Sequence, residues 1–179
     1  GSLFLNAGEQ PYKNYSEWLT HSEMKRVPHS YLLDFSKKPK WSYVMGIEME
    51  GMLDTYEAYK EGNEAILEYL KEYPQTMIDE KGNITGYKYE DFNLDNVRTA
   101  KFILRMHNIA PTKGTEKALK TLFKQLVNQP RTKEGVYWHK AIYANQVWLD
   151  GIFMGLPFYC NYAVQTMKPK KAEKYLNDA

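Results

Sequence analysis

Two aspartates stand at comparable places in the sequence, each where a polar loop gives way to an apolar helical pattern. Asp150 lies in the segment VWLDGIFMGLPFY, and Asp95 lies in NLDNVRTAKFIL. Paired carboxyl groups are the usual equipment for proton donation and water activation in glycosidic chemistry. A carboxyl flanked by Leu149, Ile152 and Phe153 is expected to be desolvated, which would raise its pKa toward the range that a proton donor needs.

The same two residues have a structural alternative. Aspartate is a preferred helix N-cap, and both positions come just before a helical pattern, so each aspartate could simply cap the helix that follows it. The residue pattern leaves both interpretations open for Asp150 and for Asp95.

Aromatic side chains accompany the two acids and could form the walls of a cleft. Trp148 lies two residues before Asp150, and His139 lies in the loop segment YWHK. Trp41 and Tyr43 open another helical pattern, where they either line a cleft or begin a core stripe. Aromatic residues make up 15% of the chain, which suits sugar stacking and core packing equally. A lone loop histidine without ligand spacing is more typical of polar surface than of a metal site.

The composition is that of a single globular domain covering residues 1–179. Hydrophobic residues make up 43% and charged residues 26% of the chain, and the formal net charge of +2 gives no reason to expect nucleic acid as a partner. No segment reaches the roughly 18 apolar residues that a membrane span needs. The sequence contains no zinc, phosphate-loop or nucleophile-elbow motif, and the single Cys160 excludes an internal disulfide.

The first two residues, Gly1 and Ser2, are typical of a remnant left by cloning. The absence of a secretion signal therefore does not decide whether the natural protein is secreted. The sequence therefore does not fix the compartment. A periplasmic or secreted location is slightly favoured over a cytoplasmic one.

Helical periodicity dominates the chain, in a repeated order of helix, short turn, helix and long loop. Pro74 and Pro130 open the two long loops that precede the acids, and the last long helix is expected to be bent or broken near Pro157. The rhythm of roughly fifty residues predicts an all-α array of α/α hairpins or a toroid. The predicted helices cover 16–26, 41–61, 64–73, 95–104, 114–126 and 146–164, with another beginning near 168.

The segment PRTKEGVYWHKAIYANQVWLDGIFMGLPFYCNYA closely resembles the signature of glycoside hydrolase family 105, the unsaturated rhamnogalacturonyl hydrolases. The segments KKPKWSYVMGIEMEGM and LDNVRTAKFIL resemble two earlier helices of that family. The resemblance runs in order from Trp18 to Ala163. Ala144 and Ala100 stand where the family commonly has proline and glycine, and neither change removes a chemical group.

The resemblance implies a fold and a set of site residues. Family members form an (α/α)6 toroid with a deep pocket at one end, and this shorter chain would supply about its N-terminal half. Asp150 matches the catalytic aspartate that acts as general acid and base. Trp148 matches a ring lining the sugar pocket, and Asp95 matches a second acid contacting the unsaturated uronate. The further substrate-binding candidates are His139, Tyr43 and Trp41.

The implied substrate is an oligosaccharide that carries a 4,5-unsaturated galacturonyl residue linked to rhamnose, as in pectin fragments. Asp150 would protonate the double bond and help water to add, and no metal or organic cofactor is implied. Because half a toroid would expose a large apolar face, we expect either self-association or a missing C-terminal half that completes it. An unsaturated glucuronyl hydrolase of related fold and a non-catalytic carbohydrate-binding module are the alternatives.

Overall fold

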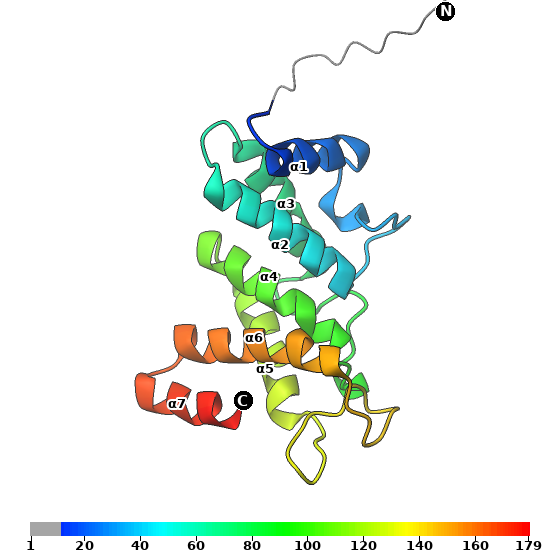
Figure 1. Ribbon diagram of the computed structural model, residues 1–179, viewed down its shortest axis with the longest axis vertical. Coiled ribbons are helices and arrows are strands. Elements are labelled where there is room, and N and C mark those ends of the chain that lie inside the picture. The colour runs from blue at the N-terminus through cyan, green and yellow to red at the C-terminus, as the bar shows by residue number, and fades with distance from the viewer. Residues whose placement is uncertain (1–11) are drawn as a thin grey trace, which may run out of the picture.

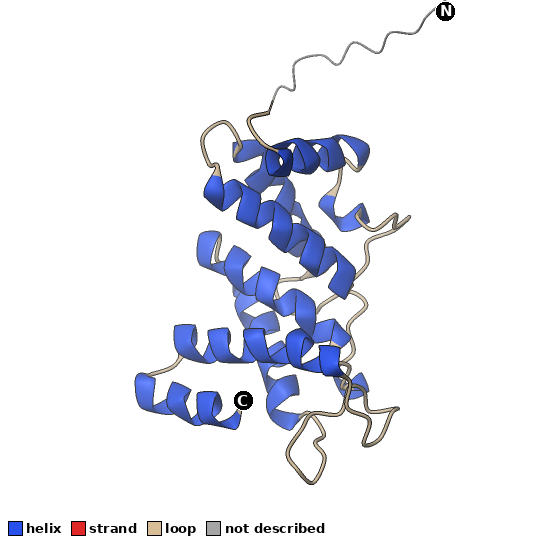
Figure 2. Ribbon diagram, in the orientation of Figure 1, coloured by secondary structure: helices blue, strands red, loops and turns tan. Residues whose placement is uncertain are grey.

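The computed structural model describes residues 12–179, so the interpretation of Gly1 and Ser2 lies outside the described part of the chain. Within residues 12–179 the secondary structure is helical, without a named strand (Figures 1 and 2). None of the helices in this part is both long and apolar enough to cross a bilayer. The elements are α1 (Tyr15–Arg26), η1 (Ser30–Leu32), α2 (Tyr43–Ala58), α3 (Glu64–Met77), η2 (Tyr89–Asp91), α4 (Asp95–Ile109), α5 (Lys113–Asn128), α6 (Leu149–Thr166) and α7 (Pro169–Asp178).

Three helices, α2, α4 and α6, form a row in which α4 packs against both of the others. Figure 1 shows them as successive parallel rungs whose N-terminal ends lie on the same side. Short turns join α2 to α3, α4 to α5 and α6 to α7, whereas the long connections 78–94 and 129–148 lead to the N-terminal ends of α4 and α6. The array of α/α hairpins predicted from the sequence rhythm is therefore confirmed.

Side-chain caps fix where several of these helices begin. The Ser42 hydroxyl accepts a hydrogen bond from the Val44 backbone N–H at 3.2 Å and starts α2. Thr112 and Thr115 form a reciprocal capping box at the start of α5. Such caps satisfy backbone N–H groups that have no partner inside the helix.

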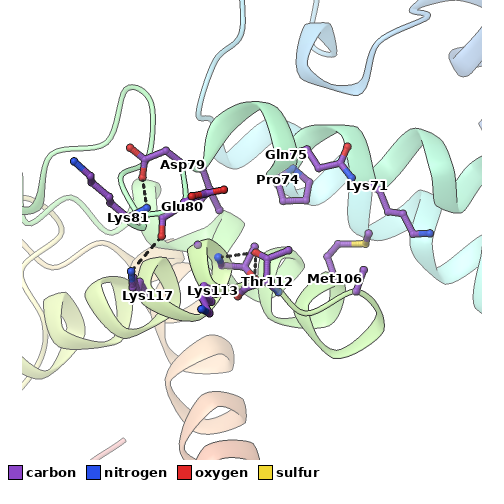
Figure 3. Close-up of a pocket in the computed structure, with 14 residues that line it drawn as sticks. Lys71, Pro74, Gln75, Asp79, Glu80, Lys81, Met106, Thr112, Lys113 and Lys117 are labelled. Carbon is purple, nitrogen blue, oxygen red and sulfur yellow. Dashed lines mark hydrogen bonds between the residues drawn. The ribbon is translucent and has the colours of Figure 1, made fainter.

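A cavity of about 680 Å³ lies between the end of α3, the first residues of the connection 78–94, the end of α4 and the start of α5 (Figure 3). Lysines surround it, and Lys117 donates to the Glu80 carbonyl at 3.2 Å across its rim. Met106 of α4 and Ala110, the residue that caps its C-terminal end, lie in the wall of the cavity. They follow the start of α4 by 11 and 15 residues, which corresponds to about 16–22 Å along the helix axis.

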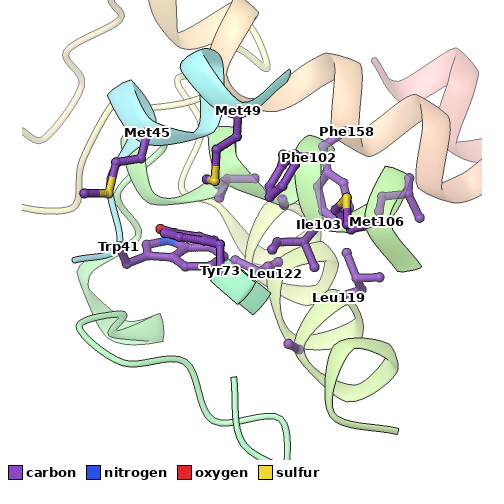
Figure 4. Close-up of a cluster of buried hydrophobic side chains, with 14 of the residues drawn as sticks. Trp41, Met45, Met49, Tyr73, Phe102, Ile103, Met106, Leu119, Leu122 and Phe158 are labelled. Atoms are coloured by element: carbon purple, nitrogen blue, oxygen red, sulfur yellow. The ribbon is translucent and has the colours of Figure 1, made fainter. Parts of the chain in front are cut away.

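The hydrophobic core runs between the row of α2, α4 and α6 and the helices behind it. Met45 and Met49 from α2 meet Tyr73 from α3 and Phe102 from α4, and Phe158 from α6 extends the same cluster (Figure 4). Each of these side chains is at most 1% exposed. The close packing of rings and thioethers explains how a chain so rich in aromatic residues fills a helical core.

Two prolines lie inside helices that the sequence pattern ends or breaks. α3 continues through Pro74 to Met77, so the expected end of the helix before Pro74 was wrong. α6 passes Pro157 as one helix, which excludes the break but not the bend. A proline removes one intrahelical N–H, but the Pro74 carbonyl still accepts from Ile78 N at 3.0 Å. Burial of Pro74 in the helix interface offsets the lost bond.

Candidate active site

The two long loops meet where α4 and α6 begin. Leu94 N, just before α4, donates to the carbonyl of His139 in the second loop at 3.0 Å. Gly151 of α6 lies against the same pair, because a Cβ at this glycine would stand 3.1 Å from Leu94 Cδ1 and 3.4 Å from His139 Nδ1. Asp95 and Asp150 are chain neighbours of these contacting residues, so the structure brings both acids to one end of the array.

Neither acid caps its helix, and the capping interpretation was wrong for both. The first turn of α4 is held by Asn93, whose side-chain oxygen accepts from Asp95 N at 3.0 Å. α6 begins at Leu149, so Asp150 already lies within its first turn, and the N-cap residue Trp148 makes no side-chain cap bond. Both carboxyl groups are therefore left for other roles.

Asp95 is engaged through both of its carboxyl oxygens. Its Oδ2 lies 3.0 Å from the Lys140 ammonium, and its Oδ1 lies 3.2 Å from His139 Nε2. The contact with His139 is close, but the ring N–H is not aligned as a hydrogen bond. The carboxylate is about four-fifths buried, so these two partners hold it in one orientation.

His139 is fully buried, and the expectation of a surface histidine was wrong. Its ring stacks on Trp148 with centroids 4.2 Å apart and planes 6° apart. Tyr143 stacks on Trp148 at 5.9 Å, and Lys140 Nζ lies 5.9 Å from both ring centroids. Trp148 is 41% exposed, so the stack presents an aromatic surface beside a cation.

Lys140 and Tyr143 belong to this group although the sequence pattern does not single them out. Lys140 is visible only as the residue after His139 in the YWHK segment. Tyr143 has no signal beyond its ring, because the loop conformation alone brings it to Trp148.

Asp150 has a different environment from Asp95. It is exposed and forms no hydrogen bond or ion pair with another residue in the part of the chain that the structure describes. The expected desolvation by Leu149, Ile152 and Phe153 was wrong, because these side chains are themselves 86%, 47% and 48% exposed. The face of α6 that carries them is not covered by the described residues.

Among the described residues no hydrogen bond, ion pair or ring stacking joins Trp41 or Tyr43 to the side chains of this group. Trp41 is 6% exposed, stacks on Tyr73 at 6.1 Å, and donates from its indole N–H to the Asn96 carbonyl at 2.8 Å (Figure 4). This placement favours the core-stripe interpretation for Trp41. Tyr43 begins α2 and is 40% exposed.

A buried ion pair lies one helical turn below the two acids. Arg98 follows Asp95 by three residues, and Phe153 follows Asp150 by three residues, which places each one turn further along the same helix face. Arg98 contacts the Glu50 carboxylate of α2, and its guanidinium lies 4.6 Å from the Phe153 ring centroid. These contacts tie α2, α4 and α6 together beneath the acids.

The cavity lined by lysines is a separate feature, because its wall lies near the opposite end of α4 from Asp95. Among residues 12–179 no group of three His, Cys, Asp or Glu side chains is arranged to hold a metal ion. The acids, the stacked rings and Lys140 are the residues in this part whose arrangement suits chemistry on a sugar.

An array of parallel helices, with acids and rings gathered at their N-terminal ends, is the arrangement expected for part of an α/α toroid. Residues 15–179 match Glycosyl Hydrolase Family 88, and the chain belongs to this family.

A glycoside hydrolase from family 105 of C. acetobutylicum ATCC 824 has a similar structure, with a TM-score of 0.76 and 32% sequence identity. The similarity covers 90% of this chain but 42% of that one. This chain thus spans less than half the length of that relative and corresponds to about half of a toroid, as the resemblance implied.

Proposed function

We propose that this chain carries the acid-bearing part of the pocket of an unsaturated uronyl hydrolase, with Asp150 as the general acid and base. The observation that supports this assignment is the contrast between the two acids. Asp95 is held by Lys140 and His139 through both oxygens, whereas Asp150 is exposed and unpaired among the described residues. A group that exchanges a proton with substrate must be free to reach it, so Asp95 is better suited to orient than to transfer.

The proposed reaction is the hydration of a 4,5-unsaturated uronyl residue. The Asp150 carboxyl gives its proton to C4, forming a C–H bond with the electrons of the double bond. Water then adds at C5 and returns a proton to the carboxylate. The resulting C5 hemiketal opens by cleavage of its C5–O5 bond, which leaves a ketone at C5 and a hemiacetal at C1. Collapse of that hemiacetal to an aldehyde breaks the C1–O bond, and the hemiacetal proton leaves with the released neighbouring sugar. Asp150 ends the cycle protonated, as it began.

Two features support an anionic sugar as the substrate. The N-terminal ends of α2, α4 and α6 lie on the side of the acids, and helix N-termini carry partial positive charge. The exposed ring of Trp148, with Lys140 beside it, offers a stacking surface next to a cation. The proposed substrate is an unsaturated galacturonyl–rhamnose oligosaccharide, and an unsaturated glucuronyl oligosaccharide is the nearest alternative.

A spectroscopic assay tests this proposal. The chain is incubated with unsaturated galacturonyl–rhamnose and, separately, with an unsaturated glucuronyl disaccharide, and loss of the ultraviolet absorbance of the double bond is followed. We expect loss with the first substrate that disappears in Asp150→Asn and persists in Glu134→Gln, a matched change at an exposed loop carboxyl. Faster loss with the second substrate would reassign the specificity. Binding without turnover would instead identify a carbohydrate-binding module.

A further inference from the structure

We infer that Gln129, the residue that caps the C-terminal end of the outer helix α5, is a positioning residue for the site formed by Asp95, His139 and Trp148. It acts through a buried set of side chains, the glutamine relay, which consists of Tyr87, Gln125 and Gln129. The inference rests on the proposed function only in treating that site as the place where substrate binds.

The relay ties both site loops to the same helix. Gln129 Nε2 donates to the Phe92 carbonyl at 2.6 Å and to the Trp138 carbonyl at 2.9 Å. Phe92 belongs to the loop before α4, and Trp138 immediately precedes His139. One amide group therefore clamps the two loops at the points where they approach the site.

Gln125, one turn earlier on α5, supports this clamp. Its Nε2 donates to the Asn93 carbonyl and to Gln129 Oε1, both at 3.2 Å, and its Oε1 accepts from the Tyr87 hydroxyl at 2.7 Å. Gln125 and Gln129 are 0% and 4% exposed. Three backbone carbonyls fix which end of each amide carries the donors, so the relay has a single direction of donation from Tyr87 to the loops.

The clamp lies directly behind the residues of the site. The Asn93 side chain holds the first turn of α4 by accepting a hydrogen bond from Asp95 N. Because Gln125 holds the Asn93 carbonyl, it also fixes the position of Asp95 at the start of α4. His139 follows Trp138, and its carbonyl accepts from Leu94 N at 3.0 Å. Phe92 has a left-handed backbone with a φ of 41°, which a non-glycine residue holds only when its surroundings impose it. The contact of Gln129 with the Phe92 carbonyl is part of those surroundings.

Gln129→Glu tests this inference because it keeps the shape of the side chain but replaces the donating NH2 group with an oxygen. That oxygen would face the Phe92 and Trp138 carbonyl oxygens without a hydrogen to donate. The measurement is the proton NMR signal of the His139 ring, which the stacked Trp148 ring shifts upfield. We expect Gln129→Glu to lose most of that upfield shift while its circular dichroism stays helical. Two controls should keep the shift: Gln75→Glu, the same change at an exposed position, and Leu119→Ala, a buried truncation on the same helix away from the relay.

Tyr87→Phe provides a milder variant that removes one hydroxyl at the far end of the relay, and we expect a smaller change in the same direction. The inference would be overturned if the His139 ring signal kept its full upfield shift in Gln129→Glu or Tyr87→Phe, provided that the variant folds. It would also be overturned if Leu119→Ala changed that shift by as much.

Turnover gives an independent readout, for which we expect kcat to fall about 10- to 100-fold in Gln129→Glu, with a smaller change in KM. A wild-type chain without turnover or binding would contradict the proposed function, and the NMR comparison would still decide the role of Gln129.

Discussion

At the scale of single residues, Glu48 on α2 is a carboxyl group whose surroundings oppose its charge. Burial is the main cause and the neighbouring Glu23 of α1 is the next, and together they raise the pKa of Glu48 to about 7. Arg26 acts in the opposite direction, while Asp34 adds to the rise. Tyr69 of α3 also faces this group. Ionisation of Glu48 therefore destabilises the folded state, whereas the protonated side chain does not.

The sign of this pKa change predicts how stability depends on pH. A carboxyl whose folded pKa is raised contributes stability that is fully present below its ordinary value and is lost as pH rises through about 7. Glu48→Gln should therefore raise the melting temperature more at pH 8 than at pH 5. Because the group is half-exposed, solvent screening limits the gain to about 1 kcal/mol, or about 2–4 °C. Thermal unfolding at both pH values measures this, with Glu61→Gln on an exposed turn as the control. An equal gain at both pH values would contradict it.

Some site residues follow from the sequence and others do not. Spacing and resemblance place Asp95 at the start of α4 and Trp148 and Asp150 at the start of α6. These helices could be located because each follows a long loop. The burial of His139 and the approach of Lys140 to Asp95 depend on how the loop 129–148 closes over α4. That closure is made by non-local hydrogen bonds, which leave no periodic signal in the sequence.

At the scale of elements, the row of inner helices depends on one close approach between α2 and α4. A Cβ placed at Gly46 would stand 2.6 Å from Thr99 Oγ1 and 2.9 Å from Thr99 Cα. Thr99 cannot move away easily, because its hydroxyl donates to the Ser42 carbonyl at 2.7 Å and is fully buried. A side chain at Gly46 would therefore force the two helices apart.

Gly46→Ala should accordingly destabilise the fold by about 1–3 kcal/mol, the usual cost of overpacking. Gly51, on the same helix, provides a matched control, since its added Cβ would meet nothing within 4 Å. There the same substitution should be neutral or stabilising by up to about 1 kcal/mol, because alanine favours helix over glycine. Urea denaturation of both variants decides this. A destabilisation of similar size in the two would show that helix packing at Gly46 is not the cause.

Helix periodicity was sufficient to predict these elements but not all of their ends. The apolar stripes of α4 and α5 are regular, so the existence of these helices follows from the sequence. The ends at Met77 and Leu149 do not, because tertiary burial carries α3 past Pro74 and the loop holds the residues just before Leu149 out of the helix. Local propensity alone cannot report either effect.

At the scale of the whole molecule, one face of α6 exposes a strip of neighbouring apolar side chains. Leu149, Ile152 and Phe153 are exposed on it, and Leu156 extends the same apolar strip. α2, α4 and α6 are successive members of one row, and the related family 105 hydrolase has more than twice the length that this chain covers. In a toroid the next hairpin would pack against this face, and residues 12–179 leave it uncovered, so a second copy of this chain could cover it in the same way.

We therefore expect the chain to self-associate through α6, with an apparent mass in analytical ultracentrifugation that rises with protein concentration. The double change Leu149→Lys with Ile152→Glu places two charges on this face, where both side chains are already exposed, so it should leave the fold intact and shift the chain to monomer. Leu19→Lys, at a comparably exposed leucine on α1, should leave the association unchanged. If two copies share this apolar face, only the changes on α6 should disrupt the association, because charges placed in the interface would have to be desolvated. A wild-type chain that stays monomeric and fully folded at all concentrations would show that this open face is stable in water on its own.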